Sequence, residues 1–262
     1  SNQVYMDVTT SHVVFVCGKR GSGKSYTMGT ICEGMASLPS EISSNLAVVM
    51  LDTMGIYWTM KYPNKQDKVL LDEWGMQAKA LDIQIYTPKG YFNKFKKEGI
   101  PTDFAFSIKP SELSPSDWCL TFGVDLNSEL GVFIDKIISR LIDKSKNFDI
   151  IDVINETKKE KDAAKHIIDA TLNRFINAKS WGLFDKEGTS MDDLIKGGQV
   201  TVLDVSCYAI TPGAEGIRAL VIGLVSKKLF LERMVARKKE EYEAVHAASY
   251  SLIEDAKEKL EN

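Results

Sequence analysis

The chain lacks the sequence features that would tie it to a membrane or to a secretion route. No apolar run approaches the ~20 residues that span a bilayer. The longest candidate, Ala219–Val225, is followed closely by Lys227 and Lys228. The first residues form neither a basic nor an apolar leader. We therefore expect a cytoplasmic protein with no membrane partner.

Side chains that could bind a transition metal are also sparse and scattered. The sequence has no C-x-x-C pair and no histidine cluster among Cys17, Cys32, Cys119, Cys207, His12, His166 and His246. Isolated cysteines in apolar surroundings indicate free thiols in a reducing compartment, and they argue against a zinc site.

An excess of positive charge is absent as well. The formal net charge of −3 gives no overall basic signature. A nucleic-acid contact would have to come from a local basic surface or from a channel lined by several subunits. The length of 262 residues fits one large α/β domain or two small ones, and an apolar content of 44% suffices for a buried core.

The most informative segment is Gly18–Ser25, a G-x-x-x-x-G-K-S loop that follows the apolar run Val13–Cys17. Glycines let the backbone N–H groups curl toward an anion, and the positive end of a helix starting at Lys24 adds to that cradle. In such a loop Lys24 reaches the β and γ phosphates, and the Ser25 hydroxyl ligates Mg²⁺. The segment predicts a triphosphate site formed by Gly18, Arg20, Gly21, Ser22, Gly23, Lys24, Ser25 and Tyr26.

Short apolar segments alternate with helical patterns along the chain. Their continuous apolarity indicates that both faces are covered, as in a mostly parallel sheet flanked by helices. The sequence therefore predicts an α/β fold. The expected strands, rich in β-branched and aromatic residues, are Val13–Cys17, Leu46–Leu51, Ile83–Tyr86, Phe104–Ile108 and Val200–Leu203.

A long helical stretch separates the last two expected strands. Apolar residues recur at helical spacing from Leu130 to Ile142, and a second helix is expected over about 162–178. The mixed-charge run Lys158–Lys161 between them predicts a solvated turn rather than a nucleic-acid patch. We expect residues 111–198 to form a helical insertion within a single domain spanning residues 1–262. A long helix should follow over about 214–245.

Hydrolysis of a triphosphate needs acidic groups beside the phosphates, to hold Mg²⁺ and to orient the attacking water. Three apolar segments end in such residues: Asp52, Asp204, and the pair Glu254 and Asp255 after Ser251–Ile253. Composition favours Asp204, whereas only the pair supplies two adjacent carboxylates. A strand-end cap for Asp204 and an ordinary surface helix for the pair remain alternatives.

Five segments together resemble the HerA branch of the HerA–FtsK superfamily of P-loop ATPases. The family's turn I-D-x-x-G-E-Y is matched with Ile56 in place of the acid, and its D-E-A-H segment is matched with the two acids inverted and Lys257 in place of His. The segments are His12–Gly29 with its K-S-Y-T-x-G continuation, Val49–Tyr57, Ile108–Ser114, Val200–Ser206, and the long helix into Glu254–Ala256.

The resemblance implies a RecA-like sheet and an ATP-hydrolysing motor. Such motors move double-stranded DNA as a hexameric ring, commonly beside a partner nuclease in DNA end processing. The resemblance implies catalytic roles for Lys24, Glu254 and Asp255, and Mg²⁺ ligation by Glu254. Ser25 of the loop and Asp204, which composition favours, are the other expected Mg²⁺ ligands. Compared with the family pattern, we expect the chain to be incomplete at both ends. Ring ATPases also use an arginine from the neighbouring subunit, and the candidates are Arg140, Arg174, Arg218 and Arg233.

Two other functions stay open. A nucleotide-dependent switch that binds ATP without efficient turnover would fit the inverted acids. A kinase or GTPase would share the P-loop, but no clustered arginine lid is visible. Asn64–Asp67 matches the guanine motif N-K-x-D, although no apolar strand precedes it. We favour the motor.

Overall fold

The computed structural model describes residues 5–7, 10, 13–209 and 215–261, with the backbone alone for residues 215 and 247–261. The chain divides into two compact units, residues 1–218 and 219–262. The single-domain organisation expected from the sequence stays a prediction.

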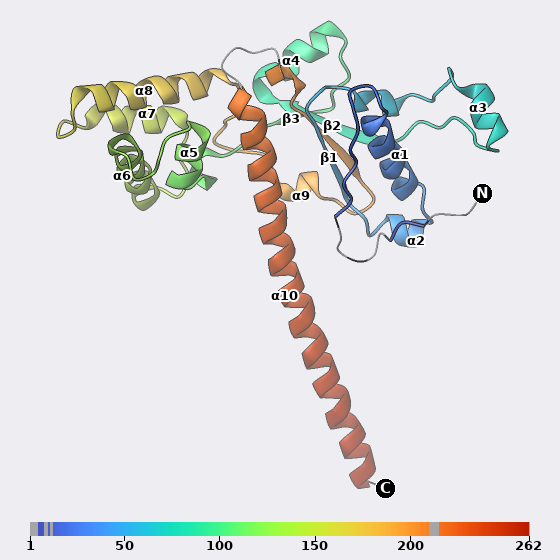
Figure 1. Ribbon diagram of the computed structural model, residues 1–262. Coiled ribbons are helices and arrows are strands. Elements are labelled where there is room, and N and C mark those ends of the chain that lie inside the picture. Colours follow the sequence, from blue (N-terminus) through green and yellow to red (C-terminus); the bar gives the residue numbers. More distant parts are fainter. Residues whose placement is uncertain (1–4, 8–9, 11–12, 210–214, 262) are drawn as a thin grey trace. The chain divides into compact units, whose positions relative to one another are not determined.

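A four-stranded parallel sheet forms the core of the first unit (Figure 1). Its register pairs Val48 with Val200 and Asp52 with Asp204, so two carboxylates end neighbouring strands. The α/β fold with a parallel sheet is confirmed, as are four of the five expected strands. In spatial order they are β1 (Val48–Asp52), β4 (Val200–Asp204), β2 (Ile83–Pro88) and β3 (Phe104–Phe106).

The fifth expected strand is not formed. Val13–Cys17 has no regular secondary structure and pairs with none of the four strands. The Val13 and Phe15 side chains are 95% and 85% exposed. The prediction was wrong because β-branched composition expresses only a preference for a pleated, half-buried surface. A strand also needs a neighbour to pair with its backbone, and none of the described residues supplies one here.

Helix α1 (Lys24–Ala36) packs on the sheet through its one buried side chain, Cys32. Helix α2 (Ser40–Ser43) links α1 to β1, and the 3₁₀ helix η1 (Tyr57–Lys61) and α3 (Lys68–Glu73) follow β1. The resulting core cluster joins α1 to η1 and three strands. It consists of Cys32, Met50, Tyr57, Ile83, Ile85, Val200 and Val202.

A block of helices lies between β3 and β4, as the apolar spacing predicted. Helices α5 to α8 contact one another in sequence and lie together in Figure 1. The expected helices correspond to α6 and α8, whereas α7, which starts with a capping box of Asp149 and Asp152, was missed. The elements are η2 (Pro110–Glu112), α5 (Pro115–Thr121), α6 (Glu129–Lys144), α7 (Ile150–Lys159), α8 (Lys165–Ser180) and α9 (Met191–Leu194).

Backbone contacts hold the two ends of this block together and tie the end of the block to α4. Ile108 forms an isolated parallel bridge with Phe184, and its N–H donates to the Leu183 carbonyl at 2.8 Å. Close by, Gly90 at the start of α4 (Lys89–Glu98) donates its N–H to the Gly182 carbonyl at 2.8 Å. A Cβ at Gly90 would lie 2.6 Å from the Gly182 Cα, so both positions require glycine.

The mixed-charge run is only in part the solvated turn that the sequence predicted, because its three lysines are exposed but Glu160 is buried. Lys158 and Lys159 end α7, and the Glu160 side chain is only 4% exposed. Its carboxylate accepts from Lys136 at 2.9 Å and from Arg140 at 3.2 Å, both on α6. The sequence could not reveal that Glu160 is buried, because the cations that pair with it lie on another helix, at least 20 residues away in the sequence.

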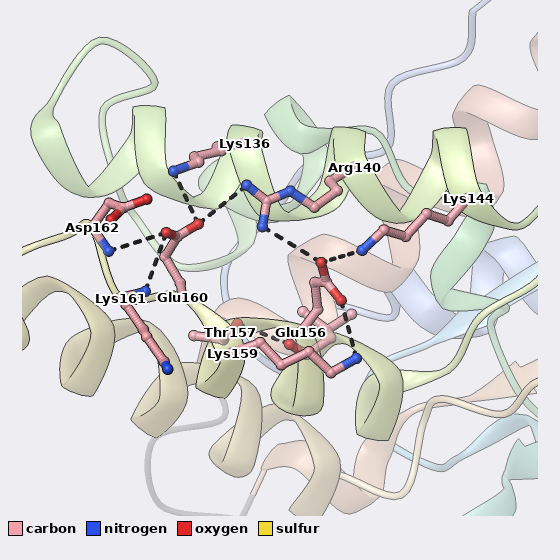
Figure 2. Close-up of polar contacts among 10 residues, drawn as sticks. Lys136, Arg140, Lys144, Glu156, Thr157, Lys159, Glu160, Lys161 and Asp162 are labelled. Atoms are coloured by element: carbon pink, nitrogen blue, oxygen red, sulfur yellow. Dashed lines mark hydrogen bonds and ion pairs between the residues drawn. The ribbon is translucent and has the colours of Figure 1, made fainter.

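Glu156 and Glu160 form an ion-pair ladder with one face of α6 (Figure 2). Glu156 pairs with Lys144 at 2.5 Å and with Arg140 at 3.5 Å, and Arg140 therefore bridges the two carboxylates. Lys136, Arg140 and Lys144 are spaced four residues apart, which aligns them along one helix face. The hydrogen bond from Lys136 is the main cause that lowers the pKa of Glu160 to about 2, and the Lys144 hydrogen bond lowers the pKa of Glu156.

The second unit is helical throughout its described residues. Helix α10 (Glu215–Glu261) starts in the first unit and continues without a break. It passes through Ser251–Ile253, the short apolar segment before Glu254. Ion pairs such as Arg237 to Glu241 at 3.0 Å stabilise its charged part. No helix in the described parts of the chain is both long and apolar enough to cross a membrane.

Candidate functional site

The Gly18–Ser25 loop has the backbone geometry that its sequence predicts. Gly21 and Gly23 adopt left-handed conformations with φ of 80° and 85°, which side chains would disfavour. A Cβ at Gly18 would lie 2.4 Å from the Ser22 Oγ. The Ser22 N–H donates to the Lys19 carbonyl at 3.2 Å and closes the loop. The glycines therefore allow the tight turn that leads into α1.

Helix α1 begins at Lys24 with an open, positive N-terminus. Gly23 provides no side-chain cap, and the first turn carries no acidic residue. The first N–H groups of a helix have no partner within the helix, and its dipole attracts anions. The Lys24 ammonium donates to the Lys19 carbonyl at 2.8 Å, which holds it over the loop. These features fit a phosphate chain.

The other predicted loop residues are accessible. Arg20 and Tyr26 are exposed, as are Gly18, Gly21, Ser22, Gly23 and Ser25, whereas Lys24 is half-buried. The structure brings all eight predicted nucleotide-site residues together at one end of α1. Their contact with a nucleotide stays a prediction.

The carboxylate of Asp52, at the end of β1, is hydrogen-bonded to backbone N–H groups of the turn that follows the strand. Its Oδ1 accepts the N–H groups of Met54 and Gly55 at 3.0 and 2.7 Å. Its Oδ2 accepts those of Ile56 and Tyr57 at 2.7 and 2.9 Å. The carboxylate, 2% exposed, therefore anchors the turn from β1 into η1.

Asp204 at the end of β4 has fewer partners. It is 3% exposed, and its Oδ1 accepts the Ser206 N–H at 2.9 Å. Burial is the main cause that raises the pKa of Asp204. Hydrogen bonds from Ser206 oppose this shift, and the negative charge of Asp52 adds to it. Of the two aspartates that end the paired strands, Asp204 therefore accepts fewer backbone hydrogen bonds than Asp52.

Tyr57 joins the Asp52 turn to the P-loop helix, a role that sequence reasoning missed. Its side chain is 9% exposed, and Gly29 of α1 faces its ring. Burial raises the pKa of Tyr57, a side-chain hydrogen bond with Ser25 opposes the shift, and the Asp52 charge adds to it. Ser25 and Tyr57 both line a pocket of about 810 Å³ that runs along α1 and η1. The signal in the sequence was the tyrosine that closes the Val49–Tyr57 segment.

The acidic pair Glu254 and Asp255 is placed as in the helical alternative that the sequence left open. Both residues lie within α10, so they do not follow a strand. Long runs of Ala, Glu and Lys favour helix strongly, and they override the short apolar segment before the pair. Catalytic roles for these two residues stay predictions.

The candidate arginines differ in their present partners. Arg140 is held by Glu156 and Glu160 in the α6–α7 ladder. Arg174 donates to the Ala170 carbonyl at 3.1 Å, and Arg233 pairs with Glu240 at 2.8 Å. Releasing Arg140 would leave two nearly buried carboxylates with fewer partners, which disfavours it as a mobile catalytic arginine.

The N-K-x-D match at Asn64–Asp67 forms a local turn. Asn64 Nδ2 donates to the Asp67 carboxylate at 2.8 Å, and Asn64 Oδ1 accepts the Gln66 N–H at 3.1 Å. The two side chains that would recognise guanine are thus bonded to each other at the start of α3. This arrangement explains the motif as turn chemistry.

The residues at the P-loop fit a magnesium–nucleotide complex. No group of three or more His, Cys, Asp or Glu side chains within the described residues could hold a metal ion alone. Mg²⁺ in such complexes is bound through one or two protein oxygens, with phosphates and water completing its shell. Ser25 on the first turn of α1 offers one oxygen, and Mg²⁺ ligation by Asp204 stays a prediction.

A parallel α/β sheet and a glycine-rich loop at a helix N-terminus define a P-loop nucleotide-binding domain. The family model described as helicase HerA, central domain, matches residues 2–214. The chain therefore belongs to this family, within the HerA–FtsK superfamily, as its sequence motifs predicted. Membership implies an ATP-dependent motor domain. A search of curated proteins finds no match.

Proposed function

We propose that this domain binds ATP with Mg²⁺ at Gly18–Ser25 and hydrolyses it to drive the movement of double-stranded DNA. The observation that carries this proposal is the loop geometry, with left-handed Gly21 and Gly23 opening an uncapped α1 and Lys24 held over the loop. Family membership supports the motor activity. A homohexameric ring and a nuclease partner in DNA end processing belong to the same proposal.

In this proposal the protein acts mainly through charge and position. Lys24 and the N–H groups of α1 stabilise the phosphates, and Ser25 would ligate the accompanying Mg²⁺. The bound ion would help to neutralise the negative charge that develops as the γ-phosphoryl group is transferred to water. Among the strand-end carboxylates, Asp204 is the one that we propose to associate with Mg²⁺. Glu254 and Asp255 keep their proposed roles of metal ligand and water-orienting acid.

The placement of the acids supports a second candidate, a nucleotide-dependent switch with slow turnover. Asp52 is fully used by four N–H groups. Glu254 and Asp255 lie in a helix, where no strand end fixes them. A site with few carboxylates fixed in position to hold Mg²⁺ or to orient water would bind ATP without hydrolysing it efficiently.

Steady-state ATPase assays with and without duplex DNA separate the two candidates. The motor predicts turnover that DNA stimulates and that Lys24→Ala lowers by about 100-fold or more, the usual effect of removing one charge-stabilising donor. Lys19→Ala is the matched control, because it removes a neighbouring cation and keeps the Lys19 carbonyl to which Lys24 donates. Tight ATP binding without turnover would contradict the motor and support the switch.

A further inference from the structure

Helix α10 carries a stripe of exposed apolar side chains along its second half. From residue 231 onward, apolar residues recur at intervals of three, four and seven, which places them on one face of the helix. Val235 and Tyr242 in this stripe are 69% and 64% exposed. Its members among the described side chains are Leu231, Met234, Val235, Tyr242 and Val245. In the sequence the same spacing continues at Leu252, Ala256 and Leu260.

The charges of α10 are separated along its length. Residues 227–239 include six Lys or Arg and one acid, whereas residues 240–261 include seven acids and two Lys. The two segments therefore have formal charges of +5 and −5. Ion pairs within the helix, such as Arg237 with Glu241, join side chains that are all more than half exposed. Such exposed pairs stabilise little, so their members can exchange partners.

Charge and apolarity together select a second copy of the same helix, running in the opposite direction, as the partner of this stripe. In an antiparallel pair the basic segment of each copy faces the acidic segment of the other, whereas a parallel pair would bring like charges together. A two-fold axis satisfies both copies at once, because each presents the same surface to the other. DNA or an anionic membrane would be attracted by the basic segment alone and repelled by the acidic one.

The apolar positions of α10 are also symmetric about one point in the sequence. With the two-fold axis between residues 243 and 244, each apolar position of the stripe before the axis lies opposite an apolar position after it. Lys238 interrupts the stripe, and its position lies opposite Ser249. A polar position within an apolar seam helps to fix the register. The opposed positions are Leu231 with Ala256, Val235 with Leu252, and Tyr242 with Val245.

We propose that α10 is a self-association surface through which two copies of this chain pair as antiparallel helices, with their apolar stripes in contact over residues 231–256. The contact goes beyond the proposed function and does not use the nucleotide site. It is two-fold, and it therefore differs from the head-to-tail contacts of a ring. Lys24→Ala, which tests the nucleotide site, should leave this pairing unchanged.

Sedimentation equilibrium of the full chain without nucleotide measures the dissociation constant of the pair. Val235→Lys places a charge in the apolar stripe of both copies and should raise this constant by roughly 100-fold, since two apolar contacts are lost at once. Ala236→Lys is the matched control, because it adds the same charge to the same basic segment at an exposed position turned about 100° away around the helix. It should change the constant by no more than about threefold.

A single-copy mass at every concentration would overturn the proposal and leave the stripe to a different partner. Equal constants for the two lysine variants, or a larger assembly that neither variant weakens, would also overturn it. Circular dichroism of each variant checks that the helix content is kept.

Salt distinguishes the antiparallel arrangement from its alternatives. The Debye length falls from about 10 Å at 0.1 M salt to about 3 Å at 1 M. The dissociation constant of an antiparallel pair should therefore rise by about 10-fold over this range, because attraction between the +5 and −5 segments is screened. A constant that stays the same or falls with salt would refute the antiparallel orientation.

Cysteine cross-linking tests the register directly. Val235→Cys and Leu252→Cys are made separately in a Cys17→Ser background, because Cys17 is an exposed thiol. Oxidation of a mixture should give a cross-linked dimer with one chain of each kind, since these positions face each other across the two-fold axis, whereas each variant alone should remain uncross-linked. Cross-linking of either variant with itself, or none in the mixture, would contradict the proposed pairing.

Discussion

The two aspartates that end β1 and β4 should respond in opposite ways to the same substitution. Asp52→Asn leaves one carbonyl oxygen where four N–H groups now find two carboxylate oxygens. The new amide group cannot accept, so two N–H donors of this buried or part-buried turn lose their acceptor. Each unsatisfied buried donor costs about 1–3 kcal/mol, and the expected loss of stability is about 4 kcal/mol.

Asp204→Asn should be neutral or stabilising at neutral pH. The asparagine oxygen can still accept the Ser206 N–H, and the substitution removes a charge that burial and Asp52 disfavour. Because the folded pKa of Asp204 is raised, ionisation opposes folding above the unfolded pKa of about 3.9. The advantage of asparagine should therefore be absent at lower pH and grow as pH rises toward the folded pKa.

Thermal unfolding at pH 7 measures both effects. At about 2–4 °C per kcal/mol for a domain of this size, Asp52→Asn should lower the melting temperature by about 8–16 °C, whereas Asp204→Asn should leave it unchanged or raise it. Repeating the Asp204→Asn melts across pH 3 to 7 checks the sign of the linkage. Equal losses for the two variants, or a larger loss for Asp204→Asn, would refute the assignment of Asp52 as the anchor of the turn.

Two further predictions concern thiols and acid stability. Cys17 is exposed beside the P-loop, whereas the other three cysteines are buried, and burial raises the pKa of Cys32 to about 11. An aromatic disulfide reagent at pH 7.5 should therefore react rapidly with one thiol. ATP with Mg²⁺ should slow this reaction, and Cys17→Ser should abolish it. Rapid reaction of several thiols would contradict the burial of the other three cysteines. Lys136 and its neighbours lower the pKa of Glu160 to about 2, so the stability that Glu160 adds is complete above its usual pKa near 4.5 and is lost as pH falls toward 2. Glu160→Gln should flatten this part of the urea-midpoint profile between pH 5 and 2, and an unchanged slope would argue against the ladder.

The sequence predicted best what depends on neighbouring residues. The Gly18–Ser25 loop and the turn after Asp52 are local, and their conformations follow from glycine positions and short side-chain-to-backbone bonds. The four strands of the sheet were visible because each is a continuous apolar segment. The same rule failed at Val13–Cys17, because pairing depends on a neighbour that composition does not reveal.

Features that join distant segments escaped sequence reasoning. Glu160 looked solvated because its partners, Lys136 and Arg140, stand on another helix. Tyr57 and Ser25 line one pocket because η1 packs on α1, which only the folded chain shows. The helical state of Glu254 and Asp255 followed from the propensity of the residues around them, which outweighed a short strand-like segment.

The bridge between Ile108 and Phe184 makes the α5–α8 block a closed excursion of the chain. The polypeptide comes back beside Ile108 at Phe184, before it reaches β4, so the two ends of the block are already as close as a short loop would hold them. Loop-closure entropy changes slowly with length, and the block can therefore gain or lose whole helices with little strain on the sheet. Evolution could use this part of the fold as an exchangeable module, and a short Gly/Ser linker between Ile108 and Phe184 offers a direct route to a minimal nucleotide-binding core.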